Sequence, residues 1–127
     1  MDSVVAFEHL LKSLDVSDLL DEIASADPPA YLRRSFAEGC SAPSLSFAMV
    51  QELALCAMVL DSIINERDYE VLEPELISDW RLHYGRECVR VRDTAMAALR
   101  RARASLRPRD PDAAAELDEL ERRLTPG

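Results

Sequence analysis

The sequence is poor in glycine, aromatic residues and lysine, and each shortage excludes a class of structure or function. Only 3 glycines occur among 127 residues, too few for the Gly-rich loop that cradles a nucleotide phosphate. Aromatic residues make up 6% of the chain, and Lys12 is its only lysine. Strand-type alternation is scarce, whereas Ala, Leu, Arg and Glu abound, and these are good helix formers. We therefore predict an all-α fold.

The chain also lacks the cysteine patterns of disulfide and zinc proteins. Its three cysteines, Cys40, Cys56 and Cys88, are odd in number and show no CxxC spacing. Cys56 and Cys88 fall on apolar helix positions, where a free cysteine behaves as a small hydrophobe. The pattern favours a reducing cytoplasm. The N-terminus has no basic region followed by a cleavage signal, and we expect no apolar stretch long enough to span a membrane.

Turn and capping signals divide the chain into helices of one domain, residues 1–127. Pro residues follow Asp or Glu at the start of three segments, and this order is typical of helix N-termini. We predict a helical bundle of four main helices plus one or two short ones. The predicted segments are 4–25 (one bent helix or two short ones), 28–39, 44–65, 74–106 and a short C-terminal capping helix within 110–127.

The segment 44–65 is the predicted centre of the bundle. It contains the longest apolar run of the sequence, from Leu53 to Leu60. A helix that is apolar nearly all round belongs inside a bundle. Helical periodicity places Glu52 in the middle of one apolar stripe, and a buried carboxylate must be paired, hydrogen-bonded or protonated.

Two interpretations of Glu52 stay open. In the first, Glu52 is structural: it pairs with an arginine of segment 81–109 or lies near a solvent-open end of the bundle. In the second, it is a general acid or base in a small-molecule pocket. The residues that would complete such a pocket share the next long helix: His83 and Glu87 as a coupled polar pair, with Trp80 and Tyr84 as aromatic walls.

His83 and Glu87 also have the i, i+4 spacing of a metal-ligand pair. The Glu-x-x-His signature of di-iron bundles is absent, however, and no HExxH motif occurs. We therefore predict no metal and no cofactor, and we interpret this flank of the helix as solvated.

Charge is distributed unevenly along this acidic chain. The net charge is −9, of which residues 1–80 carry −12, residues 81–109 carry +7 and residues 110–127 carry −4. The basic segment holds nine arginines, and we single out Arg81 and Arg90 as candidate anion-binding residues. Because the rest of the chain is acidic and no nucleic-acid-binding motif is present, pairing with acidic helices is the preferred interpretation.

Three functional classes follow, in order of preference. The first is a small cytoplasmic interaction or accessory protein that acts as a homodimer, another homo-oligomer or part of a complex. The second is a small-molecule enzyme or ligand-binding bundle that uses Glu52, and the third binds anions or nucleic acid through segment 81–109. The first class requires an exposed apolar patch that a partner covers, and the second requires a closed pocket.

Overall fold

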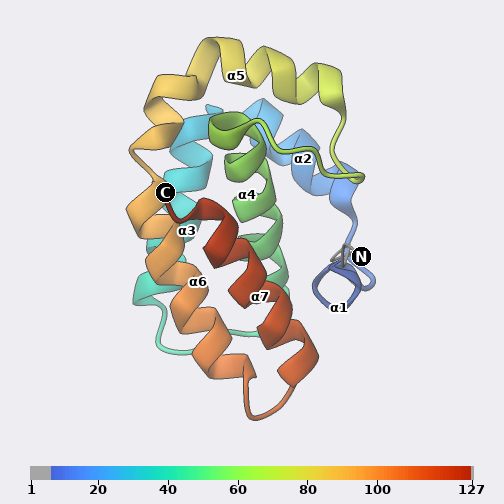
Figure 1. Cartoon of the computed structure of the whole chain (residues 1–127), viewed down its shortest axis with the longest axis vertical. Coiled ribbons are helices and arrows are strands. Elements are labelled where there is room, and N and C mark those ends of the chain that lie inside the picture. Colours follow the sequence, from blue (N-terminus) through green and yellow to red (C-terminus); the bar gives the residue numbers. More distant parts are fainter. Residues whose placement is uncertain (1–6, 127) are drawn as a thin grey trace.

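A computed structural model describes residues 7–126 of the chain, and the predicted all-α fold is confirmed (Figure 1). No strand occurs among these residues, and the part of the first predicted helix before Phe7 lies outside them. The described residues form seven helices: α1 (Glu8–Leu11), α2 (Val16–Ser25), α3 (Pro28–Ser41), α4 (Phe47–Asn65), α5 (Pro74–Val89), α6 (Arg92–Leu106) and α7 (Pro111–Leu124).

Local capping determines where most of these helices begin. Pro occupies the first turn of α3, α5 and α7, where its missing N–H costs no hydrogen bond. Asp15 caps α2 by accepting the backbone N–H of Asp18 at 3.0 Å, and Asp110 caps α7 in the same way. Ser46 caps α4 by accepting the N–H of Met49 at 3.2 Å, so the central helix begins slightly later than predicted.

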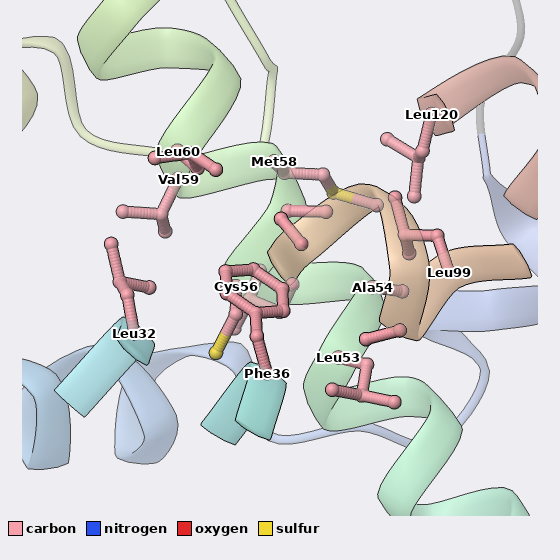
Figure 2. Packing of buried hydrophobic residues seen from close by; sticks show 14 of the residues in the cluster. Leu32, Phe36, Leu53, Ala54, Cys56, Met58, Val59, Leu60, Leu99 and Leu120 are labelled. Atoms are coloured by element: carbon pink, nitrogen blue, oxygen red, sulfur yellow. The ribbon is translucent and has the colours of Figure 1, made fainter. Parts of the chain in front are cut away.

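Helix α4 is the core of the bundle, as its apolar run predicts. Every residue from Leu53 to Ile63 is buried. Figure 2 shows Leu32 and Phe36 of α3, Leu99 of α6 and Leu120 of α7 converging on α4 from different sides. Leu117, Leu120 and Leu124 of α7 are buried too. Tyr84 is partly buried on α5, and the other residues that repeat with the helix period along α5 and α6 are buried: Ile77, Trp80, Cys88, Val91, Ala95, Ala98, Ala102 and Leu106.

The prediction of one unbroken helix from Pro74 to Leu106 is wrong. The helix is interrupted at Arg90 and Val91, and a new helix begins at Arg92. Neither Pro nor Gly stands at this break, so its cause is tertiary. Cys88 and Val91 are both buried, and the break lets α5 cross the end of the bundle while α6 runs down its side (Figure 1).

Helix α4 has the length and composition of a membrane span, contrary to expectation. Its mean hydropathy is 1.8, but 72% of its apolar window is buried by the other helices. A helix that is apolar all round and enclosed by neighbours is the ordinary core of a bundle. The apolar surface of α4 is thus covered by protein.

Gly39 has a packing role, not the helix-ending role that its position suggests. Helix α3 continues past it to Ser41. A Cβ atom at Gly39 would lie 2.8 Å from Cδ2 of Leu53 and 3.3 Å from Cβ of Ala98, so any side chain there would force Leu53 to move. Gly85 lies in the continuous helix α5, and a Cβ there would meet nothing within 4 Å.

These two glycines provide a matched test of the packing. We expect Gly39→Ala to lower the free energy of unfolding by about 1–2 kcal/mol, because overpacking outweighs the gain in helix propensity. Gly85→Ala should raise it by about 0.5–1 kcal/mol, because only the propensity gain remains. Urea unfolding of both variants measures the two changes. Equal stabilisation by both would show that Leu53 moves aside freely.

Candidate functional site

Glu52 is partly buried on α4 and faces α3. Its Oε1 atom accepts a hydrogen bond from the Tyr31 hydroxyl at 2.9 Å, and the Ser35 hydroxyl lies at 3.5 Å. Burial and this carboxylate raise the pKa of Tyr31 above its usual range, so the phenol remains a donor. The expected arginine partner is thus replaced by a tyrosine and a serine, and the carboxylate is less buried than the apolar stripe indicated.

The cavity beside Glu52 is small. Its volume is about 30 Å³, and its lining residues are Ser35, Glu38, Gly39, Met49, Glu52 and Leu53. A space of this size holds one or two water molecules. It is far below the several hundred Å³ of a typical ligand pocket.

The other predicted site residues do not line this cavity. Trp80 is buried in the core, whereas Tyr84 is partly buried on α5. His83 is exposed, with its Nδ1 atom 2.9 Å from the carbonyl oxygen of Asp79. Glu87 is exposed as well. The predicted grouping of Glu52 with these four residues around one pocket is therefore not found.

Two of the three cysteines are unsuited to nucleophilic chemistry. Burial raises the pKa of the Cys56 thiol to about 12, with the charge of Glu52 adding to the effect. Burial likewise raises the pKa of Cys88 to about 11. Both thiols stay protonated near neutral pH, and the thiolate is the nucleophile. Cys40 is exposed, and its thiol lies 3.7 Å from the carbonyl oxygen of Thr94. Among the described residues, no group of three or more His, Cys, Asp or Glu side chains could hold a metal ion.

Three arginines of α6 are occupied within the bundle. Arg100 and Arg103 pair with Glu121 of α7 at 2.6 and 2.8 Å. Arg101 donates to the carbonyl oxygens of Gly39 and Ala42, which caps the C-terminus of α3. These contacts leave α6 without a continuous free basic face.

The two arginines singled out as binding residues lie in different settings. Arg81 donates to the Ser62 carbonyl oxygen at 2.7 Å and thereby joins α5 to the end of α4. Arg90 is exposed at the break between α5 and α6.

Asp61 forms a buried polar cluster that sequence reasoning missed. Its side chain is 0% exposed and accepts hydrogen bonds from Nε of Arg67 and the hydroxyl of Tyr69, each at 2.6 Å, and from Asn65 at 2.7 Å. Neighbouring Ser62 donates to the Arg67 carbonyl oxygen at 2.6 Å. Together these bonds hold the connection between α4 and α5, which begins at Glu66 with a left-handed φ of 56°. A polar residue at a helix end gives no sequence signal of such a role.

Glu116 of α7 forms a second buried cluster, with α1. Its carboxylate accepts the backbone N–H groups of His9 and Leu10 at 3.2 and 2.9 Å, and His9 Nδ1 lies 2.7 Å from Oε2. This hydrogen bond raises the pKa of His9, and the charges of Glu116, Asp112 and Asp110 act in the same direction. No local pattern in the sequence indicates this pairing between α1 and α7.

Comparisons with protein-family models, with curated proteins and with solved structures give no match. The function of the chain is therefore argued from its own geometry.

The Asp61 cluster predicts a large effect of one buried carboxylate on stability. We expect Asp61→Ala to lower the free energy of unfolding by about 3 kcal/mol, because the buried Tyr69 hydroxyl loses its acceptor and Arg67 loses its partner. The control is Asp68→Ala, at an exposed aspartate in the same connection. This substitution should change the free energy of unfolding by less than about 0.5 kcal/mol. Chemical denaturation measures both, and equal small effects would contradict a structural role for Asp61.

The His9–Glu116 pair predicts a pH-dependent contribution to stability. The folded pKa of His9 lies above its ordinary value of 6.5. Its stabilisation is therefore fully present below pH 6.5 and is lost as the pH rises through the folded pKa. We expect His9→Gln to lower the melting temperature more at pH 5.5 than at pH 8. His83→Gln, at a histidine whose pair with Asp79 is exposed to solvent, should show a smaller pH dependence; a pH-independent effect at His9 would contradict the pairing.

Proposed function

We propose that this chain is a non-catalytic helical interaction protein that acts as a homo-oligomer or within a complex. The observation that carries the proposal is the outer face of α5. Leu82 on this face is 81% exposed and Val89 is 49% exposed, although the chain buries its other leucines fully or partly. Exposed apolar residues that share one face of a helix are typical of a surface that a partner covers.

The filled interior supports this proposal over an enzyme. The α4 core is closely packed, and the cavity at Glu52 has room for water only. Cys56 and Cys88 are protonated and buried. Two larger hollows, of about 880 and 400 Å³, lie at the surface along α5 and the connection that leads to it, so the surface is the better candidate for function.

The Glu52 cavity supports one alternative, the binding of a small polar ligand. Glu52 and Glu38 both line it, and Tyr31 and Ser35 supply hydroxyl groups beside Glu52. The third class, nucleic-acid binding, has less support because Arg100, Arg101 and Arg103 are engaged within the bundle.

We also infer a cytoplasmic location. Cys56 and Cys88 are buried as free thiols, and Cys40 is free at the surface. Unpaired cysteines are typical of reducing compartments.

Native mass spectrometry of the protein purified gently from its own source tests the proposal. We expect a homo-oligomer or a complex with another protein. A monomer that retains a small molecule would overturn the proposal in favour of the ligand-binding alternative, and Glu52→Gln should then abolish the retained mass. The Glu38→Gln variant would show whether both carboxylates of the cavity take part.

A further inference from the structure

The outer face of α5 has an arrangement of residues that suits a two-fold partner. Helix α5 crosses the end of the bundle, and its outer side is free of other helices (Figure 1). Leu82 stands near the middle of the helix, and the residues at i−7, i−4, i+4 and i+7 from it share its face. These four positions are Glu75, Ser78, Arg86 and Val89, and all four are exposed. Beside them, Asp79 and Arg90 are exposed and Gly85 is partly buried.

Charge on this face changes sign at Leu82. The N-terminal half carries Glu75 and Asp79, and the C-terminal half carries Arg86 with Arg90 just beyond the helix. Among the described residues, Glu75, Arg86 and Arg90 have no ion-pair partner within 4 Å, although the arginines of α6 and α7 are extensively paired. Asp79 lies 3.3 Å from Nδ1 of the exposed His83, a pair that solvent screens. The face thus keeps both signs of charge, in separate halves.

From this pattern we propose that a second copy of this chain docks on α5 in antiparallel orientation, with the two-fold axis at Leu82. The inference rests on the proposed function and names its partner. A two-fold axis brings residue i of one copy opposite residue j of the other, and the reverse. It places Leu82 against Leu82 of the second copy, and the acidic half of each helix against the basic half of the other.

Both shape and charge favour the antiparallel orientation. Ser78 and Gly85 flank Leu82 on the same face, and the space above Gly85 is open, so two helices can approach closely there. Glu75 and Asp79 then lie near Arg86 and Arg90 of the second copy. A parallel pair would bring acid to acid and arginine to arginine, which is destabilising.

The size of the face makes this a weak, reversible dimer. A helix of 16 residues is about 24 Å long. One pair of such helices buries less than the roughly 1,200 Å² of a stable interface, so we expect a dissociation constant between about 10 µM and 1 mM.

The first test is sedimentation velocity of the full chain at concentrations up to about 1 mM, in about 0.15 M salt to screen the net charge of each copy. We expect a monomer–dimer equilibrium, and Leu82→Gln should raise the dissociation constant at least about tenfold. The matched control is Glu87→Arg, at an exposed charge on another flank of α5. This substitution should change the dissociation constant by no more than about twofold. Because Leu82 is 81% exposed, Leu82→Gln should keep the fold, and circular dichroism checks this.

The second test uses charge reversal and does not depend on Leu82. One variant, Arg86→Glu with Arg90→Glu, makes the face wholly acidic, and another, Glu75→Arg with Asp79→Arg, makes it wholly basic. We expect each variant alone to be monomeric, because like charges then face each other across the axis. An equimolar mixture should form a heterodimer at least as tight as the wild-type homodimer.

The outcomes separate this inference from the proposed function. A wild-type chain that stays monomeric at about 1 mM, or a dimer that neither Leu82→Gln nor charge reversal weakens, would overturn docking through α5. The interaction role would still stand if native mass spectrometry shows a different partner or another homo-oligomer. A monomer carrying a small molecule in that experiment would overturn the proposed function itself.

Discussion

The structure depends on one constraint, the enclosure of a central helix that is apolar on every side. A helix such as α4 cannot face water on any flank, so other helices must surround it. Helices α3, α5, α6 and α7 pack around it, and their buried leucines meet on it (Figure 2). The close approach of α3 at Gly39, next to Leu53, follows from the same requirement. The break at Arg90 and Val91 does as well, because it lets one basic segment cover both the end and the side of α4.

Enclosure also determines what the polar residues of α4 can do. A carboxylate inside such a bundle needs hydrogen-bond donors within it. Asp61 obtains them from the connection to α5, and Glu52 obtains one from Tyr31 of α3. Tyr69, which donates to Asp61, also lies 5.5 Å beneath the guanidinium of Arg123, so this cluster joins α4 to α7. These polar groups hold neighbouring elements to α4.

Charge is balanced differently on α6 and on α5. The acidic helix α7 neutralises the arginines of α6 through Arg100 and Arg103. Helix α5 differs, because its outer acids and arginines point away from the bundle and have few partners within it. An exposed leucine between two oppositely charged halves is a self-complementary pattern, which supports the proposed docking of a second copy. Helix α5, which covers the end of the core, therefore carries an exposed leucine and both signs of charge on its outer surface.

Local periodicity was enough to establish the all-α class, the buried central helix and the core stripe of Ile77 and Trp80, because burial repeats with the helix period whatever the helices pack against. The position of the break at Arg90, the partners of Glu52 and the role of Glu116 could not be predicted. Each depends on which helices meet, and no local pattern records that. His9 and Glu116, for example, touch only because α1 and α7 lie together. The sequence by itself thus determined which residues avoid water, whereas the tertiary structure decided which polar groups pair and which, on α5, stay exposed to solvent.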